Sequence, residues 1–386
     1  MIETVFPFEE YRSRVEKIRG VMNGEGLRAL LIYGTRQWYL DHYIRYVANY
    51  DSPGRPSMIL LPLEDEPALL IGDDWDLERA RETTWIDDVR VAPDLPGATV
   101  DVMASRGLSA GKVGIAGAEG MGYSSLEVFP WDVFEAIRKA FPEIVLSDTS
   151  RQLDNLRAIR SPREIDVLRQ ASKISDIGAE AFYATVREGI SERELWTEIW
   201  YAMESAGAED AHCSMCRGPG SFWLHPASDQ RLSKGDFVSV EFSPRYHGYF
   251  SQSNKMCIIG GMTREWDKLC RLALEARDLA IALIRPGAVA SKTVNRIVEL
   301  VSKSQVGTMD MGGVHRLGHG SGPCLDEWPA LTSKSDIVLQ KDMSLAVHPI
   351  IYVPYIHSLL MLGEYVLVTE DGNELLTTPQ TEIPGV

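Results

Sequence analysis

The stretch that decides the fold of the second half of the chain is RSPREIDVLRQASKI, residues 160–174. Its SPRE segment at 161–164 has the spacing of a helix capping box with proline at the first helical position. Apolar residues then recur at helical spacing, at Ile165, Leu168, Ala171, Ile174 and Ala181. A second capping box, SERE at 191–194, follows Gly189, which we expect to end the first helix. The pattern predicts two amphipathic helices at the start of a second domain.

Beyond these helices the sequence predicts an α+β arrangement. A strand-rich run covers 237–259, two further helices lie between 265 and 304, and strands occupy 344–369. Residues 344–363 carry no charge and match the length of a membrane helix. Their prolines, histidines and many β-branched residues instead favour buried strands.

Before residue 160, the sequence alternates helical and strand patterns, which predicts a smaller α/β domain. An apolar stripe at helical spacing (Tyr11, Val15, Ile18 and Met22) is followed by strands at 27–33, 58–61, 68–71 and 144–146 and a helix at 130–141. We expect this domain to cover residues 1–155 and the second to cover 156–386.

The composition restricts the partners of this chain of 386 residues. Its net charge of −16 disfavours binding to nucleic acids and anionic membranes, so we expect neither as a partner. The N-terminal sequence has no apolar signal core, which predicts a cytoplasmic location. Five cysteines, including the pair Cys213 and Cys216 at CxxC spacing, are expected to be reduced core residues.

Eight segments occur in the order and at the spacing of the M24 group of creatinase, prolidase and methionine aminopeptidase. They are RSPREIDVLRQASKI, REGISERELW, LHPASDQRLSKGDF, EFSPRYHGYFSQ, LGHGSG, DEWP, AVHPIIY and GEYVLVTEDGNELLT. The chain resembles this group strongly from about 158 to 386, and its first 155 residues resemble the creatinase/prolidase N-terminal domain. The resemblance implies an α+β "pita-bread" catalytic domain after a smaller α/β domain, and a homodimer.

Metallopeptidases of this group hold two divalent ions with two Asp, one His and two Glu, because carboxylates that bridge two cations lower the pKa of a shared water. The matching positions here are Glu241, Gln252, His319, His348 and Glu364. A neutral amide at Gln252 neither balances nor bridges two dications. The resemblance therefore implies that the dinuclear centre is lost.

Two interpretations of these positions stay open. In the first the site binds no metal, as in creatinase and ectoine hydrolase, and Glu241 and Glu364 grip a cationic substrate. In the second, Gln252, His319, His348 and Glu364 hold one divalent ion.

The resemblance also implies a role for His225, which stands where creatinase has its general base. His319, Asp326 and Glu327 are further candidates for substrate binding. Asp326 replaces a second histidine of the group, and the DEWP segment resembles the dimethylsulfoniopropionate lyases of this fold. By analogy, Arg45 and Tyr46 of the first domain are candidates to reach a neighbouring subunit's site.

These observations predict a hydrolase that cleaves a carbon–nitrogen bond in a small cationic or zwitterionic non-peptide substrate, with His225 as general base and Glu241 and Glu364 at the substrate. One alternative is a mononuclear-metal M24 enzyme, either a peptidase acting on Xaa-Pro bonds or a carbon–sulfur lyase. Another is a non-catalytic binding module with the same fold.

Overall fold

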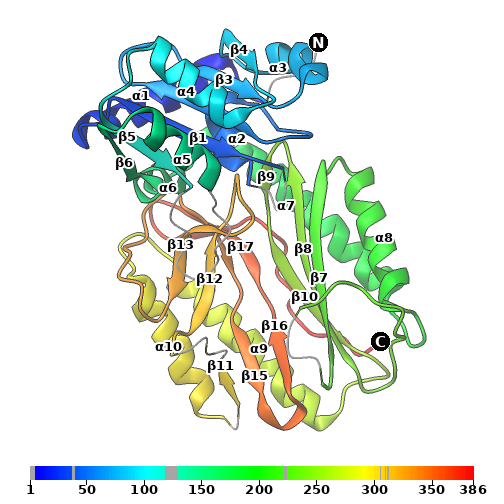
Figure 1. The fold of residues 1–386 in the computed structure, drawn as a ribbon. Helices are drawn as coiled ribbons and strands as arrows, with labels where there is room; N and C mark the ends of the chain where they lie inside the picture. Colours follow the sequence, from blue (N-terminus) through cyan, green and yellow to red (C-terminus); the bar gives the residue numbers. More distant parts are fainter. Residues whose placement is uncertain are drawn as a thin grey trace. The chain divides into compact units, whose positions relative to one another are not determined.

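The structure is a computed structural model that describes residues 5–36, 40–117, 129–220, 224–304, 306–308, 310 and 313–386. The chain divides into two compact units, Met1–Arg157 and Ala158–Val386 (Figure 1). Each unit has its own sheets and its own hydrophobic core.

The first unit is built on a six-stranded mixed sheet in the order β4-β3-β2-β1-β5-β6. Strand β2 runs antiparallel to both of its neighbours, whereas the other adjacent pairs are parallel. The strands are β1 (Ala29–Gly34), β2 (Ser57–Pro62), β3 (Ala68–Ile71), β4 (Asp88–Val91), β5 (Gly111–Ala116) and β6 (Ile144–Asp148). All four predicted strands are present, at β1, β2, β3 and β6.

Six described helices belong to this unit. They are α1 (Phe8–Gly24), α2 (His42–Ala48), α3 (Leu77–Thr83), α4 (Leu95–Ser105), α5 (Trp131–Ala140) and α6 (Ser150–Ala158), with a short 3-10 turn, η2, at Asp74–Asp76. The predicted stripe Tyr11, Val15, Ile18 and Met22 is the buried face of α1. The predicted helix at 130–141 is α5.

The second unit begins with the two predicted helices, α7 (Pro162–Thr185) and α8 (Glu192–Ser205). Both capping boxes form, with Ser161 and Ser191 each accepting from the amide three residues later while the glutamate there bonds back. Helix α7 ends before Gly189, because Val186 leaves the helical region and is buried in the core with Ile190.

Three antiparallel sheets make up the rest of the second unit. One contains β7 (Asp210–Gly218), β8 (Phe237–Tyr246), β9 (Tyr249–Phe250) and β10 (Ser253–Ile258). The second has the order β13 (Glu327–Thr332), β12 (Arg316–Gly320), β14 (Ser344–Val347), β17 (Glu364–Val368) and β18 (Asn373–Leu375), and the third contains β11 (Gly307–Thr308), β15 (Ile350–Val353) and β16 (Ser358–Met361).

Helices α7 and α8 pack on the β7–β8–β10 sheet, and α9 (Arg264–Leu283) and α10 (Ala290–Ser302) share a core with the five-stranded sheet (Figure 1). A short 3-10 turn, η3 (Pro354–Ile356), joins β15 to β16. Residues 344–363 thus form buried strands, as expected. Within the described part of the chain, no helix has both the length and the apolarity needed to cross a membrane.

The two larger sheets meet at one backbone bridge. The Asn254 amide donates to the Gly363 carbonyl over 2.9 Å, and the Gly363 amide returns a bond to Asn254 over 3.2 Å. This bridge brings the start of β10 next to Gly363, the residue before β17. His348 directly follows β14, which pairs with β17, and His319 lies in the neighbouring strand β12.

Candidate active site

The β8–β9–β10 hairpin places Glu241 and its neighbours on one face of a sheet. Its turn at His247 and Gly248 has positive φ at both residues and pairs Tyr246 with Tyr249. The same register sets Asn254 opposite Glu241. Because side chains alternate along a strand, Gln252 shares this face with them, whereas Ser253 and Lys255 lie on the opposite one.

Helix α7 covers that opposite face. The hydroxyl groups of Ser175 in α7 and Ser253 in β10 are 2.8 Å apart. Glu241 therefore lies on the face of the sheet that is turned away from α7.

Glu241 is a buried carboxylate whose partners in the described part of the chain are neutral amides and one histidine. Gln252 Nε2 donates to its Oε2 over 2.9 Å, and Asn254 Nδ2 lies 3.4 Å from the same oxygen. His212 Nε2, from β7, is 3.9 Å from Oε1. No described lysine or arginine comes within ion-pair distance of Glu241. Its charge is thus solvated by dipoles and lacks a fixed cation.

Two buried histidines lie beyond the bridge between the sheets. Their ring centroids are 5.1 Å apart in an edge-to-face arrangement. His348 packs on Gly363, where any side chain would collide with it. Gly363 is bridged to Asn254, and Asn254 lies opposite Glu241, so this series of contacts connects the two rings to Glu241. Glu241, His319 and His348 therefore belong to one site.

The glycines around His319 allow close packing of strands. A Cβ at Gly318 or Gly320 would collide with the carbonyl oxygens of Ala346 and Trp328. LGHGSG is therefore a close-packed strand beside the site.

Both imidazoles are biased towards the neutral form. Burial lowers the pKa of His319 below its usual range, although Asp326 opposes the shift. Burial and the adjacent His319 lower the pKa of His348 well below its usual value. In the described part of the chain, neither ring nitrogen of His348 has a hydrogen-bond partner. Both rings are therefore acceptors or weak donors at neutral pH rather than fixed cations.

Asp326 joins this site through Arg316 and His319. Arg316 Nη2 donates to Asp326 Oδ2 over 2.6 Å, and Asp326 Oδ1 lies 3.4 Å from His319 Nδ1. The same Nδ1 is 2.8 Å from the Gly320 carbonyl oxygen. Glu327, the next residue, instead pairs with Arg160 in a fully buried ion pair. The structure thus places Asp326 beside His319, whereas the carboxylate of Glu327 is buried and paired with Arg160.

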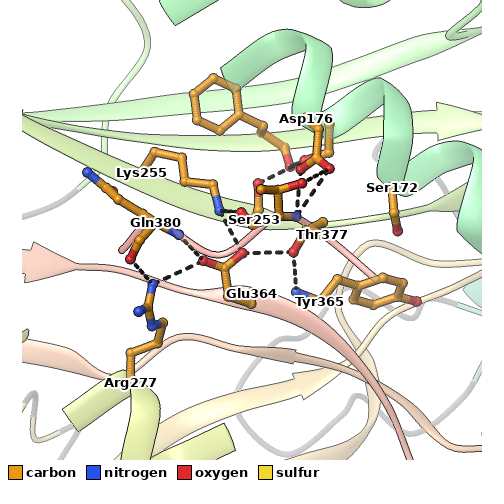
Figure 2. Close-up of polar contacts among 12 residues, drawn as sticks. Ser172, Asp176, Ser253, Lys255, Arg277, Glu364, Tyr365, Thr377 and Gln380 are labelled. Atoms are coloured by element: carbon orange, nitrogen blue, oxygen red, sulfur yellow. Dashed lines mark hydrogen bonds and ion pairs between the residues drawn. The ribbon is translucent and has the colours of Figure 1, made fainter. Parts of the chain in front are cut away.

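Glu364 faces away from His348, because its neighbour Gly363 is the residue that faces the histidine. Figure 2 shows its carboxylate among cations: Lys255 Nζ is 2.6 Å from Oε2 and Arg277 Nη1 is 3.2 Å from Oε1. The Thr377 hydroxyl donates to Oε2, and the backbone amide of Gln380 donates to Oε1. The predicted roles of Glu364 at the substrate or at a metal are therefore not supported.

Comparison with known proteins identifies the family. Residues 166–370 match Metallopeptidase family M24, and residues 14–159 match the Creatinase/Prolidase N-terminal domain. The chain belongs to metallopeptidase family M24. This confirms the resemblance found in the sequence and the expected enzyme class, a hydrolase of carbon–nitrogen bonds.

Relatives of this M24 chain include named peptidases. It is 28% identical over 234 residues to a Xaa-Pro dipeptidase of Pyrococcus furiosus, a match that covers 60% of this chain and 66%, just under two thirds, of that relative. It is 23% identical over 376 residues to the uncharacterized peptidase YqhT of Bacillus subtilis, covering 96% and 99%.

The prolidase structure from Pyrococcus horikoshii matches this chain with a TM-score of 0.82 at 22% identity, covering 96% of this chain and 99% of that one. This likeness confirms the expected pita-bread fold with a creatinase-type N-terminal domain.

The side chains of this M24 chain do not fit the metal pair that the family implies. Glu364 is neutralised by Lys255 and Arg277, and Gln252 directs its amide donor at Glu241. No group of three or more His, Cys, Asp or Glu in the described ranges is arranged to hold an ion. The expected mononuclear set of Gln252, His319, His348 and Glu364 does not converge either, because Glu364 lies on the other face of its strand.

Three other predicted residues each have surroundings of their own within their unit. His225 is part-exposed, pairs through its backbone with Met215, and has Nε2 3.9 Å from Glu192 Oε1 at the start of α8. Among the described residues, no hydrogen bond or ion pair joins it to Glu241 or His319. In the first unit, Tyr46 is buried beneath the Arg14 guanidinium, and Arg45 lies near Asp41 and Asp51.

His212, Asn254 and Arg316 are site residues that were not predicted from the sequence. A signal existed for Asn254, since a two-residue turn at His247 and Gly248 sets it opposite Glu241. Lys255 and Arg277 carried no such signal, because their pairing with Glu364 depends on packing between β10, α9 and β17.

Proposed function

We propose that this M24 chain hydrolyses a carbon–nitrogen bond in a small substrate that carries a nitrogen cation, without a resident metal pair. Glu241 binds the cation. The buried imidazoles of the same site accept a proton from water and return it to the leaving nitrogen. The observation that carries this proposal is the buried Glu241 carboxylate, which two amides solvate but no described lysine or arginine neutralises.

A buried carboxylate without a cation is costly, so such a group is retained where a ligand supplies the charge. An amidinium, guanidinium or ammonium group would donate charge-assisted hydrogen bonds to Glu241 Oε1, the oxygen that the two amides leave open. The neutral state of His319 and His348 supports the same chemistry, because a second fixed cation there would repel the substrate.

A second candidate is hydrolysis of Xaa-Pro dipeptides. The names of the relatives favour it, including the Xaa-Pro dipeptidase of Pyrococcus furiosus, and a dipeptide also carries a cationic amine. If that activity needed two divalent ions, it would have to use ligands other than Glu364, whose oxygens are bound by Lys255 and Arg277. The two candidates therefore differ in metal dependence and in substrate.

The deciding experiment is calorimetric titration of guanidinoacetate and of Gly-Pro into the parent and into Glu241→Gln, with turnover followed by product amine. We expect guanidinoacetate or a related guanidino compound to bind and turn over with and without chelator. Glu241→Gln should bind it about 30-fold more weakly, which corresponds to about 2 kcal/mol for a charged hydrogen bond. Asp229→Asn removes an exposed carboxylate paired with Arg193 and is the matched control.

Hydrolysis of Gly-Pro that is abolished by chelator would establish the second candidate. Binding without turnover of any such compound would support the non-catalytic module instead. The homodimer and the cytoplasmic location stay predictions, and sedimentation of the purified chain tests the first of them.

A further inference from the structure

We infer that His319 is the general base of the proposed hydrolysis and that Asp326 is the residue that positions it. The sequence had predicted His225 as the general base. The inference rests on the proposed function. It follows from a chain of three contacts, Arg316 to Asp326, Asp326 to His319, and His319 to the backbone of Gly320.

The Gly320 carbonyl selects one tautomer of His319. A carbonyl oxygen only accepts hydrogen bonds, so the Nδ1 that lies 2.8 Å from it must carry the proton. Nε2 then keeps its lone pair. A neutral imidazole with a free Nε2 is the form in which histidine takes a proton from water.

Asp326 stabilises the charge that forms when His319 accepts this proton. Its Oδ1 is 3.4 Å from Nδ1, in a site where the ring is buried and an isolated imidazolium would be poorly solvated. Arg316 holds the other carboxylate oxygen at 2.6 Å, which fixes the carboxylate on the Nδ1 side of the ring. A carboxylate that orients a histidine and stabilises its imidazolium is a recurring catalytic arrangement.

The other histidines lack this combination. His225 is part-exposed, and its Nδ1 faces the carbonyl of its neighbour Pro226 while Nε2 lies 3.9 Å from Glu192. His348 has no hydrogen-bond partner on either ring nitrogen in the described ranges, so nothing fixes its tautomer. Among the described histidines, only His319 combines an Nδ1 held by a carbonyl, a carboxylate that an arginine fixes beside that nitrogen, and an edge-to-face contact with the His348 ring, which packs on Gly363.

The proton and bond changes balance without a further reactant. Water gives one proton to His319 Nε2 as its oxygen bonds to the substrate carbon that carries the nitrogen. The carbon–nitrogen bond then breaks, and the same proton passes from Nε2 to the leaving nitrogen. One water is consumed, an amine or ammonia is released, and His319 returns to its starting tautomer.

The first arm of the test needs no substrate. Nitrogen-15 spectra of histidine-labelled parent at pH 7.5, with His319 assigned through His319→Gln, should show the proton on Nδ1. The Nδ1 signal should move in Asp326→Asn and stay in place in the surface control Asp229→Asn. A proton on Nε2, or a signal that ignores Asp326→Asn, would overturn the inference.

The second arm is kinetic and uses whichever of guanidinoacetate or Gly-Pro the parent hydrolyses. His319→Gln should lower kcat roughly 100-fold or more, the range expected for general acid–base catalysis. Asp326→Asn should lower kcat at least tenfold with KM within about threefold of the parent, and Asp326→Glu should recover part of the loss. Equal kcat in Asp326→Asn and the parent, or a His225→Gln variant that alone loses activity, would contradict our assignment.

Failure of the proposed function is distinguishable from failure of this inference. If Glu241→Gln binds the probe as tightly as the parent, the cation-binding role is wrong. The spectra and the kcat of Asp326→Asn still decide whether Asp326 positions His319.

Discussion

Glu241 and Glu364 are both buried glutamates of the second unit, yet their surroundings are opposite. Glu364 is held between the ammonium of Lys255 and the guanidinium of Arg277, with both oxygens in hydrogen bonds (Figure 2). Glu241 is solvated by the amides of Gln252 and Asn254 and has no described lysine or arginine beside it. The face of the strand on which each glutamate lies therefore decides its role. The glutamate on the helix side stabilises the fold, and the one on the other side is available to a ligand.

The largest expected effect is the loss of stability when Glu364 is neutralised. Burial lowers the pKa of Lys255 and raises that of Glu364, and the attraction between the two opposes both shifts. Glu364→Gln leaves buried Lys255 without its paired anion and leaves Arg277 with Asp278 alone, so we expect a loss of about 3–5 kcal/mol. Urea denaturation followed by tryptophan fluorescence measures it.

The matched variant on the other face is Glu241→Gln, which removes a carboxylate that lacks a fixed cation. We expect its free energy of unfolding to stay within about 1 kcal/mol of the parent or to rise, because a buried uncompensated charge is removed. Similar losses in both variants would break the distinction between the two glutamates.

A double variant sharpens the assignment of Glu364. Lys255→Met combined with Glu364→Gln removes one charge of each sign, so the pair should cost less than the sum of the single variants. We expect a coupling energy of about 1–3 kcal/mol in a double-mutant cycle. Additive losses would show that the contact seen between Lys255 and Glu364 contributes little to stability.

A smaller effect is expected from acid, through His348. Its pKa in the folded chain lies well below the usual value, because burial and His319 disfavour the charge. The unfolded chain therefore binds this proton first, so stability is full above about pH 6.5 and falls as the pH drops below it. The slope is at most about 1.4 kcal/mol per pH unit for one proton. Denaturation of the parent and of His348→Gln between pH 5 and pH 8 should show a shallower fall in the variant.

Much of the fold was predictable because its signals are local. The two capping boxes and the α1 stripe depend on residues three or four apart, and each formed as expected. The end of α7 was not, because Gly189 offers a stop signal while the burial of Val186 ends the helix earlier.

The candidate site was predictable only in part. The structure places Glu241, His319, His348 and Asp326 at one site, and their roles there stay predictions. Glu364 lies elsewhere, because its neighbour Gly363 faces His348 and residues one apart in a strand point to opposite faces. His225 depended on the resemblance alone, and its surroundings at α8 involve contacts distant in sequence.

The most direct test of the account is elemental analysis of the chain purified without added metal or chelator, repeated after dialysis against manganese. We predict close to zero Mn, Fe, Co, Ni and Zn per chain in both samples, since Glu364 is neutralised by lysine and arginine and Gln252 brings no charge. About two ions per chain, the content of a dinuclear hydrolase, would contradict the account and return this chain to metal-dependent hydrolysis of Xaa-Pro dipeptides.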